Sequence, residues 1–102
     1  MTPSAHAAVS VLLIDDDVEL VRLLAQLFAR EGITLRSATT GAAGLDGLKP
    51  VPSLVLLDLM LPDTHGKEVF RRLRERMPEL PVIMLTAKGD PVDRVIGLEA
   101  DH

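Results

Sequence analysis

The stretch Val11-Leu12-Leu13-Ile14-Asp15-Asp16-Asp17 decides the fold, because a short apolar run that ends in acids is typical of a buried parallel strand. A second run, Leu54-Val55-Leu56-Leu57, ends in Asp58, and a third, Val82-Ile83-Met84-Leu85, ends in Thr86. The carboxyl ends of parallel strands lie along one edge, where open α/β sheets bind ligands. We therefore expect carboxylates and a hydroxyl on one rim. Clustered carboxylates repel each other unless a cation lies among them, which predicts a metal-dependent site.

Apolar residues between these runs recur at helical spacing. The first helix is expected to begin at Asp16 or Asp17, either of which can act as N-cap, and Glu19 stands at capping-box spacing from Asp16. Gly32 is expected to end this helix in a left-handed conformation. The expected apolar stripe of the helix consists of Leu20, Leu23, Leu24, Leu27 and Phe28.

The remaining elements continue the alternation. Strands are expected over residues 9–14, 33–37, 54–57 and 82–85, and further helices over residues 40–48 and 65–77. The helix at 65–77 has an expected inner face of Val69, Phe70, Leu73 and Met77. Asp90-Pro91 predicts the start of a last helix, whose buried stripe would be Val92, Val95 and Ile96.

The predicted fold class is α/β. The order β-α-β-α-β-α-β-α, with right-handed crossovers and helices on both faces, indicates a doubly wound parallel sheet. Residues 1–8 are expected to be a flexible N-terminus, and residues 9–102 to form one domain.

Composition narrows the function classes. The 102 residues carry a net charge of −4, which argues against a nucleic-acid surface, since binding a phosphate backbone needs a basic stripe. The absence of cysteine excludes disulfides and thiol chemistry. No apolar stretch is long enough to span a bilayer, and residues 1–8 lack the pattern of a secretory signal, so we expect no membrane contact and a cytoplasmic location.

The expected rim suits phosphoryl transfer. Asp58, held at the end of a buried strand, can act as a nucleophile that forms an acyl phosphate. Asp15 and Asp16 would bind Mg²⁺, a hard cation that takes oxygen ligands, together with Asp58, a backbone carbonyl and waters. Thr86 could donate a hydrogen bond to a phosphoryl oxygen.

Simpler interpretations compete at several of these positions. Asp favours helix caps and turns, which is the preferred interpretation for Asp17 and Asp90, while capping and metal binding stay equally open for Asp16 alone. The three histidines share no metal-ligand spacing and are expected to be solvated loop residues: His6, His65 and His102. Four arginines are expected to form an exposed helix face that pairs with Glu68 and Glu75: Arg71, Arg72, Arg74 and Arg76.

The chain resembles the receiver domain of two-component response regulators. The resemblance rests on residues 12–17, on Leu56 to Pro62 together with Gly66, and on residues 82–87, in that order and at these spacings. Residues 88–99 are similar to the subfamily that carries a winged-helix DNA-binding output domain.

This resemblance implies a flavodoxin-like receiver sheet, here of order 2-1-3-4. It implies that Asp58 accepts a phosphoryl group from a sensor histidine kinase. Mg²⁺ would be ligated by Asp16, Asp58 and the carbonyl of Met60, with Asp15 holding a metal-bound water. Thr86 would be the switch hydroxyl. Such a domain is a signalling module rather than an enzyme.

The chain departs from the family pattern at its end. A fifth strand, which ends in a Lys-Pro pair, and a fifth helix would follow His102, and the lysines present are Lys49, Lys67 and Lys88. Residues 9–102 are therefore interpreted as a partial receiver. Without the lysine we expect Mg²⁺ binding with weak or absent phosphorylation. With an open strand edge and bare apolar faces we expect a homodimer or higher oligomer.

Three alternatives remain open. The first is a non-phosphorylated oligomerisation or interaction module built on the truncated fold. The second is a Mg²⁺-dependent phosphohydrolase, which is disfavoured because Met60 stands where an acid/base Asp would be needed. The third is a flavin site, for which no phosphate-cradling loop follows the first strand.

Overall fold

The computed structural model describes residues 9–85 of the chain. Its elements are β1 (Ser10–Ile14), α2 (Val18–Arg30), β2 (Thr34–Ala38), α3 (Gly41–Asp46), β3 (Leu54–Asp58), α4 (Gly66–Arg76) and β4 (Val82–Leu85). The predicted flexible N-terminus, Thr86 and the helix predicted from Asp90-Pro91 lie outside the described residues.

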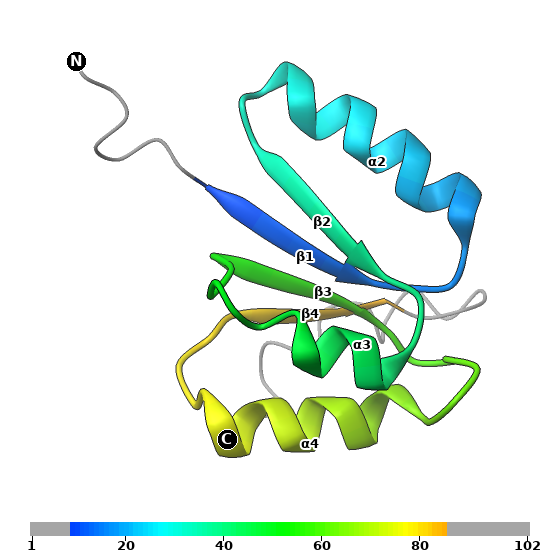
Figure 1. Ribbon diagram of the computed structural model, residues 1–102, viewed down its shortest axis with the longest axis vertical. Helices are drawn as coiled ribbons and strands as arrows, with labels where there is room; N and C mark the ends of the chain where they lie inside the picture. Colours follow the sequence, from blue (N-terminus) through cyan, green and yellow to red (C-terminus); the bar gives the residue numbers. More distant parts are fainter. Residues whose placement is uncertain (1–8, 86–102) are drawn as a thin grey trace.

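The strands form a parallel sheet of order β2-β1-β3-β4, which confirms the predicted topology. Helix α2 covers one face of the sheet, and α3 and α4 cover the other (Figure 1). The central strands β1 and β3 are in register from Val11↔Leu54 to Ile14↔Leu57, so their carboxyl ends stop side by side. This register brings the residues that follow β1 next to the end of β3.

The core lies between the sheet and α4. Leu12 and Ile14 of β1 pack in one cluster with Val55 and Leu57 of β3 and with Leu73 of α4. The predicted inner face of α4 is confirmed: Val69, Phe70 and Leu73 are buried, and Met77 packs against the same cluster. Because β1 and β3 are buried and apolar, the backbone at their carboxyl ends is held in place.

The ends of α2 follow from single residues. Asp17 is the N-cap, and its side chain accepts the amide hydrogens of Glu19 and Leu20. The predicted capping box between Asp16 and Glu19 is therefore wrong, because Glu19 lies only two residues from the cap. Gly32 follows the helix at φ 75°, a left-handed conformation that glycine adopts without a Cβ clash, as predicted.

The predicted apolar stripe of α2 is only partly covered. Leu23 and Leu27 are 53% and 41% exposed, and none of the residues of α2, all of which are described, is buried. Figure 1 shows the reason: among the described elements, α2 is the only helix on its face of the sheet. A sheet surface alone covers the near side of a helix and leaves its flank in solvent.

The arginines of α4 do not all share one face. Arg71 pairs with Glu68 and Glu75, and Arg72 pairs with Glu68, as predicted. The prediction that Arg74 belongs to the exposed face is wrong. Its guanidinium lies 5.0 Å from the Phe70 ring centroid and donates to the carbonyl of Pro78 at 3.2 Å. It stabilises the turn that leads into β4. Within residues 9–85, no helix is long and apolar enough to cross a membrane.

Truncating one leucine on each face of the sheet should show that the two faces contribute unequally to stability. Leu73→Ala removes a fully buried side chain and should lower the free energy of unfolding by about 2–5 kcal/mol. Leu23→Ala removes a side chain that is 53% exposed and should cost less than about 1 kcal/mol. Urea denaturation of both variants and the parent chain measures the difference, and equal costs would contradict the described arrangement.

Candidate metal centre

Three carboxylates meet at the carboxyl ends of β1 and β3. Asp15 and Asp16 directly follow β1, and Asp58 is the last residue of β3. Each offers one carboxylate oxygen, and these oxygens all lie within 4.8 Å of one another. Asp15 and Asp58 are only 5% and 8% exposed, whereas Asp16 is exposed at the rim. The structure thus brings together three of the residues that the sequence placed at this site.

Backbone amides orient the two buried carboxylates. The Asp17 amide donates to Oδ1 of Asp15 at 2.9 Å, and the Met60 amide donates to Oδ1 of Asp58 at 3.3 Å. The Asp15 amide donates to the carbonyl of Ala38 at the end of β2, at 2.9 Å. Each buried carboxylate is therefore oriented by the amide two residues further along the chain.

Burial sets the electrostatics of the cluster. Desolvation raises the pKa of Asp15, opposed by the Asp17 amide and supported by the negative charge of Asp58. Desolvation likewise raises the pKa of Asp58, opposed by the Met60 amide and supported by the charge of Asp16. Two buried acids that resist ionisation beside a third are relieved by a divalent cation, and hard carboxylate oxygens are the donors that Mg²⁺ prefers.

Two further predicted residues have different outcomes. Met60 lies in the loop after β3, with its amide on Asp58 and its side chain 60% exposed, and the role expected of its carbonyl stays a prediction. Thr86 lies outside the described residues. Its predecessor Leu85 pairs in register with Asp58, so β4 ends at the same edge of the sheet as β3.

His65 is exposed, as expected, and also has a structural role. Its Nδ1 accepts the Lys67 amide hydrogen at 3.1 Å, which makes it the N-cap of α4. A histidine cap is uncommon, so the sequence offered no signal for it. His6 and His102 lie outside the described residues.

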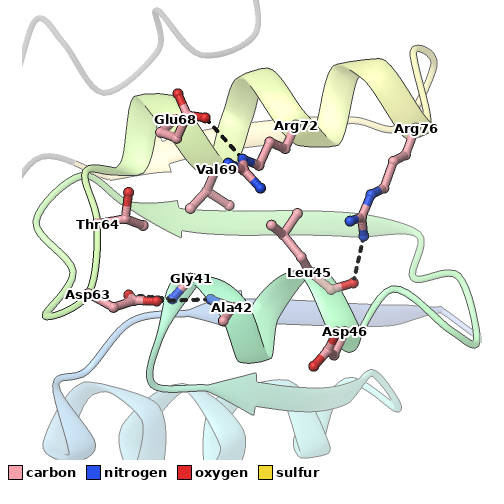
Figure 2. Close-up of a pocket in the computed structure, with 10 residues that line it drawn as sticks. All are labelled: Gly41, Ala42, Leu45, Asp46, Asp63, Thr64, Glu68, Val69, Arg72 and Arg76. Carbon is pink, nitrogen blue, oxygen red and sulfur yellow. Dashed lines mark hydrogen bonds and ion pairs between the residues drawn. The ribbon is translucent and has the colours of Figure 1, made fainter.

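A separate cavity of about 340 Å³ lies between α3 and α4 (Figure 2). Its walls come from Leu45 of α3 and Val69 of α4, and Arg76 closes one end by donating to the carbonyl of Leu45 at 3.5 Å. None of the three clustered acids lines it. The chemistry predicted from the sequence is therefore located at the sheet edge and not in this cavity.

Asp63 is a residue that sequence reasoning missed. Its two carboxylate oxygens accept the amide hydrogens of Gly41 and Ala42, at 2.8 and 3.1 Å, at the start of α3. These hydrogen bonds lower the pKa of Asp63. Asp63 and Gly41 are far apart in the sequence, and no local pattern links a loop aspartate to the beginning of a particular helix.

Replacing Asp58 should stabilise the metal-free chain near neutral pH. The folded pKa of Asp58 lies above 3.8, so the folded chain binds more protons than the unfolded chain between pH 3.8 and the raised pKa. Wild-type stability therefore falls as the pH rises through that window. Asp58→Asn removes this loss, so its advantage should be present above the window and vanish below pH 3.8.

Thermal unfolding followed by circular dichroism in a chelating buffer, at a series of pH values, measures this difference. Asp46→Asn serves as a control, because Asp46 is an exposed acid at the end of α3. An advantage of Asp58→Asn that persists unchanged into acid would contradict the prediction.

Comparison with known proteins places the chain in a family. The family model of the response regulator receiver domain matches residues 11–102. The transcriptional regulatory protein CpxR homolog of Haemophilus influenzae is 44% identical over 89 residues, covering 87% of this chain and 39% of that protein. The transcriptional regulatory protein GltR of Pseudomonas aeruginosa is 45% identical over 93 residues, covering 88% of this chain and 38% of that protein. The chain spans about two fifths of the length of these relatives.

Solved structures agree with the sequence comparison. A CheY-like receiver domain protein of Methanospirillum hungatei superposes with a TM-score of 0.79 at 27% identity, covering 92% of this chain and 76% of that one. The non-phosphorylated HemR receiver domain of Leptospira biflexa superposes with a TM-score of 0.77 at 28% identity, covering 89% and 74%. Together with the sheet order and the acidic edge, these matches show that the chain belongs to the response regulator receiver domain family of two-component signalling.

Proposed function

We propose that the chain takes a phosphoryl group on Asp58 from the phosphohistidine of a sensor histidine kinase, in a reaction that depends on Mg²⁺. The observation that carries this proposal is the meeting of Asp15, Asp16 and Asp58, with ligand oxygens within 4.8 Å of one another, at the edge where doubly wound sheets bind ligands. Membership of the receiver family supports the same assignment, because receiver domains are the partners of sensor histidine kinases.

In this proposal Asp58 is the nucleophile. One of its carboxylate oxygens forms a bond to phosphorus while the bond from phosphorus to the imidazole nitrogen of the kinase breaks, and the electron pair of that bond stays on the nitrogen. The Met60 amide, at 3.3 Å from Oδ1, fixes the rotation of the carboxylate. Phosphoryl transfer asks mainly for such positioning and for charge stabilisation, because its transition state is loose.

The residues at the edge fit a bound Mg²⁺ by their chemistry. The carboxylates of Asp15, Asp16 and Asp58, with the carbonyl of Met60, would hold it directly or through water. When bound, the cation neutralises charge on the carboxylates and on the transferred phosphoryl oxygens. Thr86, the residue after β4, would donate its hydroxyl to a phosphoryl oxygen at the same edge.

The residues around Asp58 favour a signalling domain that stays phosphorylated over a phosphohydrolase that turns over. An aspartyl phosphohydrolase needs a second acid close to the nucleophile to move protons to and from the leaving group and water. Two positions after Asp58 stands Met60, whose side chain has no titratable group and is 60% exposed. The product proposed here is therefore a phosphorylated chain that persists long enough to change the affinity of a partner.

Substitution of Asp58 should abolish phosphorylation while keeping the fold. We expect Asp58→Asn to take up no phosphoryl group from acetyl phosphate with Mg²⁺, and Asp16→Asn to take it up more slowly than the parent chain because a rim oxygen ligand loses its charge. Intact-mass spectrometry over time measures both. Asp46→Asn, which removes an exposed acid outside the cluster, should behave as the parent chain. Labelling of Asp58→Asn to the parental level would exclude Asp58 as the acceptor.

Self-association stays a prediction, and two observations favour it. Leu23 and Leu27 of α2 are more than two fifths exposed, and β4 is the outermost of the described strands beside β3. An interaction module, the second candidate function, would use such surface. Sedimentation velocity over a wide concentration range, with Leu23→Lys as the matched variant, tests it. A monomer at every concentration would exclude it.

A further inference from the structure

The loop between β3 and α4 closes at its base through backbone contacts. The Gly66 amide donates to the carbonyl of Leu59 at 2.7 Å, and Met60 and His65 form an isolated bridge above it. A Cβ at Gly66 would collide with the backbone of Asp58 and Leu59, so only glycine allows this close approach. These contacts fix the two ends of the loop. They do not involve its tip, residues 61–64.

Asp63 ties this tip to helix α3. Its Oδ1 and Oδ2 accept the first two amide hydrogens of the helix, from Gly41 and Ala42 (Figure 2). The side chain of Thr40 accepts the third, from Ala43. Amides at the start of a helix have no partner within it, and hydrogen bonds to a carboxylate are stronger than neutral ones. One side chain from the loop therefore accepts two of the three amide hydrogens at the start of α3.

The packing beneath this tie is equally close. A Cβ on Gly41 would lie 2.7 Å from Cγ2 of Thr64 and 2.8 Å from Cγ2 of Val69. The start of α3 thus fits against both the loop and the first turns of α4. A larger residue at position 41 would push the loop away from the helix.

The helix start is itself fixed to the acidic cluster from the other side. Ala38, the last residue of β2, accepts the Asp15 amide hydrogen at 2.9 Å, and only Thr39 and Thr40 separate it from α3. A path of short contacts therefore leads from Asp15 through β2 and α3 to Asp63, and from there along the loop to Met60. It joins the two sides of the cluster independently of the pairing of β1 with β3.

We propose that Asp63 is a positioning residue for the Mg²⁺ site: by tying the loop after β3 to the start of α3, it fixes the backbone of Met60 relative to Asp15 and Asp58. The metal part of this inference rests on the proposed function. The structural part, the contact between Asp63 and the start of α3, does not rest on it, because loss of this contact should make the loop more mobile with or without a cation.

The experiment compares Asp63→Ala, Asp63→Asn and Asp46→Ala with the parent chain. Asp63→Ala removes both acceptors, Asp63→Asn keeps one oxygen for the Gly41 amide and removes the charge, and Asp46→Ala removes a charge from the far end of α3 (Figure 2). The amide hydrogen exchange rates, measured by NMR without Mg²⁺, show whether the loop is held against α3. Calorimetric titration with MgCl₂ measures the affinity of the site for the cation.

We expect Asp63→Ala to accelerate exchange at Gly41, Ala42 and Met60 and to weaken Mg²⁺ binding by about tenfold, the lower end of what loss of a ligand-orienting partner costs. Asp63→Asn should recover most of both effects, and Asp46→Ala should match the parent chain. Recovery by the asparagine separates hydrogen bonding from charge. Should Asp63→Ala unfold, the comparison of Asp63→Asn with Asp46→Ala still measures the tie at Ala42.

Three results would overturn the inference. One is unchanged exchange at Met60 in Asp63→Ala, and another is equal weakening by Asp46→Ala, which would reduce the effect to charge. The third is faster exchange without any change in Mg²⁺ affinity. A parent chain that binds no Mg²⁺ would instead refute the proposed function, and exchange at Met60 would then decide the tie alone.

Discussion

Two carboxylates, those of Asp15 and Asp58, are buried side by side at the ends of neighbouring strands, and the sheet holds them together although their negative charges repel each other. β1 and β3 pair in register, so Asp15 and Asp58 cannot separate without breaking the central ladder of the sheet. Burial and the negative charges of neighbouring acids raise the pKa of both groups, which means that the fold keeps them together at a cost in stability. Perturbed pKa values of this kind are typical of functional sites, where a bound cation relieves the repulsion.

Much of this could be predicted from the chain itself. The apolar runs at 11–14, 54–57 and 82–85 have no polar residue, so their identity as buried parallel strands and the convergence of Asp15, Asp16 and Asp58 followed from strand chemistry. The strand order was implied by the resemblance to the receiver family and is confirmed by the sheet. Helix ends marked by residues with a specific backbone preference, such as Gly32, were equally readable. These features depend on local chemistry and on the geometry of parallel sheets.

What could not be predicted depends on contacts between distant segments. Arg74 leaves the exposed face of α4 because the turn before β4 presents carbonyls to it, and Asp63 finds α3 only after the sheet has formed. The exposure of Leu23 depends on what stands beside α2, which helical periodicity does not encode.

The thin cover of α2 has a consequence for the dynamics of the acidic edge. A helix without a fully buried residue gains less from tertiary packing than the central strands do, so it should open before them in sub-global fluctuations. The Asp17 amide that orients Asp15 belongs to the N-cap of this helix, so each opening of α2 also loosens the Asp15 carboxylate. Whatever shields the flank of α2 would thereby tighten the hold on Asp15 from a distance, with no contact to the carboxylate itself.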